Sequence, residues 1–135
     1  MKELAGRTIE RVERDEKSHH LAFYTSKGER LLYVCVDDCT CDETWVHHFS
    51  GVSAVLGGTI SAIEEIPEYE SYPATRQEDD HGEHRVRDRV FGYRLITNKG
   101  TAVVELRNSS NGYYNGSMEL ETLHEATPVA VTDDF

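Results

Sequence analysis

Apolar and polar side chains alternate along much of the chain, which is the pattern of half-buried β-strands. The alternation runs through five segments, namely 21–23, 32–36, 90–97, 101–107 and 117–123. The corners Ser26-Lys27-Gly28 and Asn98-Lys99-Gly100 suit hairpin turns, because glycine takes a positive φ without steric cost. The pattern predicts a mainly β domain of the α+β class, with about seven antiparallel strands and one short helix.

The expected helix falls within residues 43–58. Its apolar residues recur at helical spacing, namely Trp45, Val46, Phe49, Val52, Val55 and Leu56. Gly57-Gly58 would end a helix, and Gly51 weakens its middle. We therefore expect one or two short helical turns here.

Two further segments are predicted to lie outside the regular structure. Residues 68–85 are polar and acidic, which is typical of a loop. The segment after Thr127-Pro128 carries no strong strand or helix pattern. We expect a single mainly β domain over 1–127 and a loose tail over 128–135.

Two pairs of similar segments within the chain indicate an internal duplication. Residues 6–13 resemble 58–64, since both carry Thr-Ile, then two residues, then an aliphatic residue and glutamate. The segment FYTSKGERLLYV at 23–34 resembles LITNKGTAVVEL at 95–106. If the halves are related, the polar loops at 37–42 and 108–116 occupy equivalent positions. The competing interpretation is that β-hairpins simply look alike.

Composition narrows the classes of function. Of 135 residues, 25 are acidic and 14 basic, which gives a net charge of −11. This balance opposes general nucleic-acid binding, which needs basic side chains to neutralise phosphates. No apolar run is long enough to predict a membrane span, and the first residues lack the apolar core of a signal peptide. Three clustered cysteines do not form a secreted disulfide framework, so we expect a cytoplasmic protein.

A cluster of cysteine and histidine residues offers ligands for a metal. Cys39, Cys41, His47 and His48 would be the zinc ligands if a metal binds. Their spacing is not a standard zinc motif, and buried cysteines often pack as small apolar residues. Acidic neighbours also disfavour a reactive thiolate. No cofactor is therefore predicted, with zinc kept as an alternative.

The run RNSSNGYYNG, residues 107–116, is the second candidate site. Its two Asn-Gly pairs favour turns, whereas its tyrosines, serines and asparagines are typical of recognition surfaces. Both interpretations stay open. As a binding site for a ligand or partner, it would use these residues and one from the acidic loop: Arg107, Asn108, Ser110, Asn111, Tyr113, Tyr114 and Asp38.

These loops also carry a family resemblance. The segments VDDCTCDETWVHHFSGVSAVLGGTISAIEEI and YRLITNKGTAVVELRNSSNGYY resemble small proteins of unknown function from bacteriophages, notably actinobacterial ones, and from some bacteria. The shared marks are a loop like Asp-Cys-Cys, a Thr-x-Lys-Gly hairpin and Ser-Asn-Gly-Tyr-Tyr. Thr40 separates Cys39 from Cys41, where the family has an adjacent pair. The resemblance implies a fold and a phage origin but no activity.

We expect a small, phage-type accessory protein that acts as a non-catalytic binding module. Its partner would be a host protein or a small molecule, in a host-takeover or anti-defence role. One alternative is a small metal-assisted or acid–base enzyme without assigned catalytic residues. The other is a minor structural or assembly protein that forms oligomers.

Overall fold

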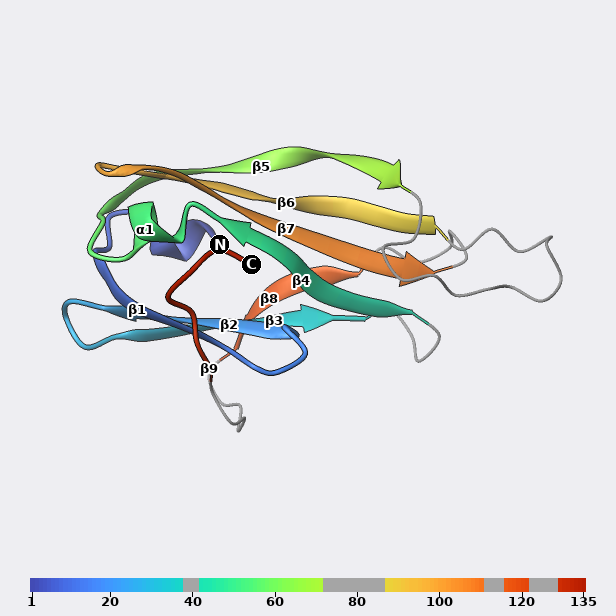
Figure 1. Cartoon of the computed structure of the whole chain (residues 1–135), viewed down its shortest axis with the longest axis horizontal. Helices are drawn as coiled ribbons and strands as arrows, with labels where there is room; N and C mark the ends of the chain where they lie inside the picture. The colour runs from blue at the N-terminus through green and yellow to red at the C-terminus, as the bar shows by residue number, and fades with distance from the viewer. Residues whose placement is uncertain (38–41, 72–86, 111–115, 122–128) are drawn as a thin grey trace, which may run out of the picture.

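Two antiparallel sheets packed face to face form the body of the protein (Figure 1). The computed structural model describes residues 1–37, 42–71, 87–110, 116–121 and 129–135. The first sheet has the strand order β8 (Ser117–Glu121), β3 (Arg30–Val36), β2 (His20–Thr25), β1 (Ile9–Arg14) and β9 (Val129–Ala130). The second has the order β4 (Glu43–Ser50), β7 (Gly100–Ser110), β6 (Arg87–Thr97) and β5 (Ile60–Ser71). With the short helix α1 (Val52–Val55) and the 3-10 turn η1 (Lys2–Leu4), this confirms the mainly β, α+β fold.

Each half of the chain, β1–β4 and β5–β8, contributes its fourth strand to the sheet of the other half. Strands β1, β2 and β3 follow one another in the first sheet, and the chain then crosses so that β4 pairs with β7 in the second. Strands β5, β6 and β7 repeat this path, and β8 crosses back to pair with β3. Each sheet therefore contains three consecutive strands of one half and the fourth strand of the other.

An approximate twofold relation connects the halves at the start of β1 and β5. Thr8 and Thr59 bridge each other, and their hydroxyl oxygens lie 2.6 Å apart. The backbone bonds around them come in matched pairs: Ile9 to Gly58 (3.0 Å) with Ile60 to Arg7 (2.9 Å), and Gly6 to Ile60 with Gly57 to Ile9 (both 2.7 Å). The bulges match too, since one lies between Ile9 and Arg11 and the other between Ile60 and Ala62. This geometry supports the internal duplication.

The core fills the space between the sheets. Phe23, Tyr33 and Phe49 are among its largest fully buried side chains, and Phe23 contacts the other two rings at centroid distances of 5.9 and 6.3 Å. Burying one large apolar side chain contributes about 1.5–3 kcal/mol. Leu21, on β2, faces the same core. The two sheets are thus held together chiefly by apolar packing.

The helical turns predicted over 43–58 are wrong for the first half of that segment. Residues Glu43–Ser50 form β4, and the helix is confined to Val52–Val55. The pairing of β4 with β7 shifts between Val46 and His48, so a bulge inserts one extra residue there. The buried Val46 and Phe49 therefore lie three positions apart, which imitates helical spacing. Gly51, with a φ of 73°, then turns the chain into α1.

The acidic segment predicted as a loop from residue 68 is partly strand. Strand β5 continues to Ser71, and its last residues pair with β6 across a second shift between Ile66 and Tyr69. Residues 72–86 of that predicted loop lie outside the described structure. The strand persists because its partner β6 extends equally far, a pairing that local composition does not reveal.

The segment after residue 128 is packed rather than loose. Strand β9 pairs with β1, and Val131 is buried. The backbone of Phe135 exchanges two hydrogen bonds with Phe49 of β4, at 2.8 and 3.1 Å. Asp134 accepts bonds from the backbone N–H groups of Gly51 and Val52. Figure 1 shows this red segment rising from β9 to β4, where it closes one open side of the sandwich.

Candidate functional site

A buried polar cluster joins the chain segments that flank the two polar loops. Asn108 of β7 is fully buried and donates from Nδ2 to Asp42 Oδ2 (2.7 Å) and Thr44 Oγ1 (2.8 Å). The backbone N–H of Thr44 donates to Asp37 Oδ1 at 2.6 Å. A Cβ on Gly116 would lie 2.1 Å from Thr44 Oγ1, so glycine is required there. The residues that flank both loops therefore meet at one end of the sandwich, as the internal repeat predicts.

Arg107, predicted to contact a ligand, is paired within the second sheet. Its side chain is 13% exposed, and Nη1 donates to Asp88 Oδ2 at 3.2 Å. The carboxylate of Glu105 lies 3.8 Å from Nε of the same guanidinium. Arg107 thus lies between two carboxylates, whereas the side chain of Asn108 forms hydrogen bonds within the buried polar cluster.

The other predicted site residues are not placed by the structure. Asp38, Cys39, Cys41, Asn111, Tyr113 and Tyr114 lie outside the described residues, and only the backbone of Ser110 is described. Of the predicted metal ligands, His47 and His48 are described.

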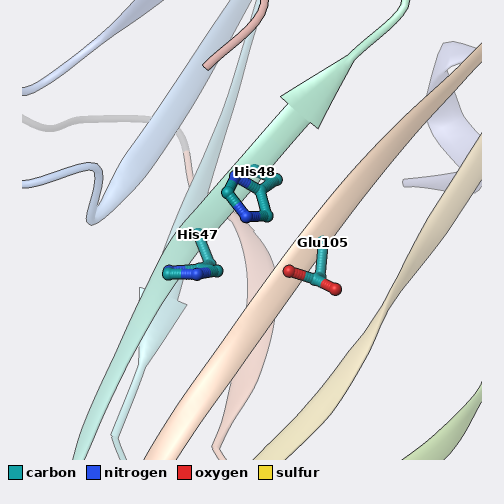
Figure 2. A group of neighbouring side chains, drawn as sticks. All are labelled: His47, His48 and Glu105. Carbon is teal, nitrogen blue, oxygen red and sulfur yellow. The ribbon is translucent and has the colours of Figure 1, made fainter. Parts of the chain in front are cut away.

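His47 and His48 lie side by side with Glu105 on the outer face of the second sheet (Figure 2). The bulge in β4 turns both adjacent histidines away from the core, and their ring centroids are 4.2 Å apart. Glu105 of β7 lies opposite His48 in the strand register. One ligand atom from each of the three residues lies within 4.8 Å of the other two. Partial burial, followed by the neighbouring His48, lowers the pKa of His47, so its imidazole is neutral at neutral pH.

Glu105 is not among the site residues predicted from the sequence, although the alternation of its segment contains a signal for it. In the alternating segment 101–107, Val104 and Leu106 face the core, so Glu105 and Arg107 share the opposite face. The bulge that brings His47 and His48 together depends on the pairing of β4 with β7, so it leaves no pattern in the local sequence. The two histidines, predicted to lie on a helical turn, therefore lie on strand β4.

A groove opens between the sheets on the side of β5 and β8. Its volume is about 380 Å³, and we call it the β5–β8 groove. Phe91 and Tyr93 of β6 and Met118 of β8 supply its apolar lining. The guanidinium of Arg89 lies over the Phe91 ring at 4.3 Å and donates from Nε to Glu68 at 2.9 Å. The groove therefore combines an aromatic floor with a charged rim.

Cys35 is the one cysteine within the described residues, and it packs against the core. Burial, followed by the charges of Asp15 and Asp37, raises the pKa of its thiol well above the usual value. The group is a thiol at neutral pH and a poor nucleophile. Its environment agrees with the interpretation of a cysteine as a small apolar core residue.

These features define a pseudo-symmetric β-sandwich whose halves exchange their fourth strands, with a groove on one open side and a histidine cluster on one outer face. The chain belongs to the DUF7448 family, described as a domain of unknown function, which matches residues 2–120. This confirms the predicted membership of a family of unknown function. No curated protein and no solved structure matches the chain.

The family match ends before β9, so the segment that closes the β1 and β4 side lies beyond it. Within the described residues, no helix has the length and apolar character needed to span a membrane.

Proposed function

We propose that this protein is a non-catalytic binding module that holds an extended, basic segment of another protein in the β5–β8 groove. One observation carries the proposal. By the twofold relation, the side of the sandwich between β5 and β8 is equivalent to the side between β1 and β4. The chain's own residues 129–135 occupy the latter side, and the β5–β8 side is hollow among the described residues.

The covered side indicates how a partner segment would bind. Strand β9 pairs with β1 at Glu13 and Arg14. The equivalent positions in β5, matched through the shared bulge, are Glu64 and Glu65. A partner strand would add to this edge and place its next side chains in the groove, a known mode of peptide recognition. Pro67 has no N–H to donate, so the added strand would stop near it.

The chemistry of the groove selects the partner. Phe91, Tyr93 and Met118 favour an apolar or aromatic side chain, as Phe135 provides on the covered side. Strand β5 carries exposed glutamates, among them Glu65 at the groove rim and Glu68, which already pairs with Arg89. With a net charge of −11, the protein would attract a segment rich in lysine or arginine and raise its rate of association.

For the biological setting, we propose a phage-encoded accessory protein that binds a host protein. The support is the resemblance noted from the loop motifs, together with a fold that offers a recognition groove. Sequestration of a small molecule in the same groove is the other binding role, and native mass spectrometry of the purified protein separates the two. A retained organic mass would favour the small molecule.

The test is selection of short random peptides on the immobilised full-length protein, followed by affinity measurement with a fluorescent copy of an enriched peptide. We expect enriched peptides to alternate apolar with basic residues. Ser117→Phe, which fills the groove, should weaken binding about tenfold or more, equivalent to about 1.4 kcal/mol. The matched control Ser53→Phe places the same ring on exposed α1, near the opposite end of β6, and should leave affinity unchanged. Enriched peptides without basic residues, or equal binding by Ser117→Phe, would overturn the proposal.

A further inference from the structure

We propose that His47, His48 and Glu105 bind a divalent transition metal of the zinc class on the outer face of the second sheet. This site is separate from the β5–β8 groove, and neither proposal depends on the other. Two imidazoles and one carboxylate form a donor set that suits zinc, copper and nickel ions. Three protein ligands leave at least one coordination position for water or for a group from a partner.

The backbone geometry is the first support. In a regular strand, adjacent residues point to opposite faces, so His47 and His48 would be separated by the sheet. The bulge places both on one face, with Glu105 opposite His48 on the neighbouring strand. The ligand set therefore exists because of a local irregularity in β4. The other half lacks it, since the position equivalent to the His48–Glu105 pair is Glu119 opposite Val34.

The lack of a hydrogen bond, within the described part of the chain, to one carboxylate oxygen of Glu105 is a second, independent observation. Its Oε2 atom is buried and accepts no hydrogen bond from the described residues. Nε of Arg107 forms an ion pair with this atom at 3.8 Å, a distance that is too long for a hydrogen bond. A buried carboxylate oxygen without such a bond is costly, and a coordinated cation would relieve that cost.

The three ligand atoms are close enough together for one ion to lie between them. The three ligand atoms lie within 4.8 Å of one another. Tetrahedral zinc, with bonds of about 2.0 Å, separates its ligands by about 3.3 Å. To hold one ion, the two rings and the carboxylate would have to turn toward one another by this difference. Asp88, which pairs with Arg107, offsets the positive charge that would otherwise oppose a cation here.

Trp45 makes this site directly observable. Its Nε1 donates to His47 Nδ1 at 3.2 Å, and it is the only tryptophan in the chain. If a metal takes Nδ1, the acceptor is lost. If it takes Nε2, the ring proton moves to Nδ1, and Trp45 again loses its acceptor. Metal binding should therefore change tryptophan fluorescence in either geometry.

The experiment is titration of chelator-treated full-length protein with zinc chloride, followed by calorimetry and tryptophan fluorescence, and repeated with cobalt for its visible spectrum. We expect one ion per chain and a fluorescence change that saturates with it. Glu105→Gln and His47→Gln should each weaken affinity about tenfold or more, the loss typical even of ligand-supporting groups. Far-UV circular dichroism checks that the variants are folded, and Glu105→Gln preserves side-chain shape if His47→Gln does not fold.

His19→Gln is the matched control, because His19 also lies beside carboxylates, those of Asp15 and Glu43. It should retain the wild-type affinity and fluorescence response. Absence of zinc binding would overturn the proposal. Zinc binding that both Glu105→Gln and His47→Gln retain would also overturn it, since the ion would then sit elsewhere, for example at Cys39 and Cys41.

Discussion

Replacing Asn108 with aspartate is the sharpest test of the buried polar cluster. The two side chains have nearly the same shape, but the carboxylate has no donor. It would face Asp42 Oδ2 at the position where Asn108 Nδ2 now donates over 2.7 Å. Asn108 is fully buried and Asp42 is 7% exposed, so water cannot screen the pair well. The substitution therefore changes charge and hydrogen bonding while it preserves packing.

The size of the effect follows from this contact. Two carboxylates about 3 Å apart cannot both ionise, so one must take up a proton. At pH 7, protonating a carboxyl of ordinary pKa, about 4, costs about 4 kcal/mol. The added proton lets one carboxyl donate a hydrogen bond to the other. The loss of the original charged hydrogen bond, about 1.5–3 kcal/mol, is therefore not added to the protonation cost. We expect Asn108→Asp to lower the free energy of unfolding by about 4 kcal/mol at pH 7.

The effect should shrink in acid. The shared proton raises the pKa of one carboxyl in the folded state above its unfolded value. Stability is then fully present below the unfolded pKa and is lost as the pH rises through the folded one. Between pH 7 and pH 5 the penalty should fall by up to about 2.7 kcal/mol, at about 1.4 kcal/mol per pH unit.

Urea unfolding of the wild type, Asn108→Asp and Asn108→Ala at pH 5 and pH 7 measures this. The alanine variant loses both hydrogen bonds of Asn108 and adds no titratable group, so its penalty should change little with pH. If the penalty of Asn108→Asp is the same at both values, the introduced carboxylate does not face Asp42 in a buried site, and the reasoning fails.

Three further predictions test other contacts. Gly116→Ala should lower the free energy of unfolding by about 2 kcal/mol or more in urea titration, because its φ of 65° and the closeness of Thr44 both exclude a Cβ. An unchanged midpoint would contradict the placement of Gly116 beside Thr44. Cys35 should resist alkylation at neutral pH until the protein unfolds, since burial raises its thiol pKa; mass spectrometry of peptides locates the label, and rapid native labelling would refute the burial. The backbone N–H groups of Gly51 and Val52 lower the pKa of Asp134, so its contribution to stability should be present above the unfolded pKa and disappear as the pH falls through the folded one. Asp134→Asn should remove part of that acid dependence, as thermal unfolding across pH would show.

The sequence predicts the parts of the fold that depend on local chemistry. The two Lys-Gly corners form hairpins, because glycine lowers the cost of the turn and the flanking alternation fixes which faces are buried. The repeat around Thr8 and Thr59 also indicates the relation between the halves, although it does not reveal that the two threonines contact each other. Both features are visible in short windows of sequence, without knowledge of distant partners.

Other features depend on pairings over long sequence separations and could not be predicted in this way. The misplaced helix at 43–50 resulted from a bulge that arises only when β4 pairs with β7. The packed 131–135 segment depends on a gap between β1 and β4 that exists only in the assembled sandwich. The histidine cluster combines a predictable and an unpredictable feature. The local alternation places Glu105 on an outer face of the sheet, but only the bulge in β4 places His47 and His48 together on that same face.

The twofold relation gives a reason to seek function where the halves differ. Features common to both, such as the Thr8–Thr59 contact and the paired bulges, are explained by folding, since each half needs them to form its meander. The extra residue in β4 has no counterpart in β8, and it creates the only His–His–Glu cluster found among the described residues. The segment that covers β1 and β4 likewise has no described counterpart over β5 and β8. An irregularity that folding does not require in the related half needs another explanation, and recognition of a metal or a partner strand supplies one.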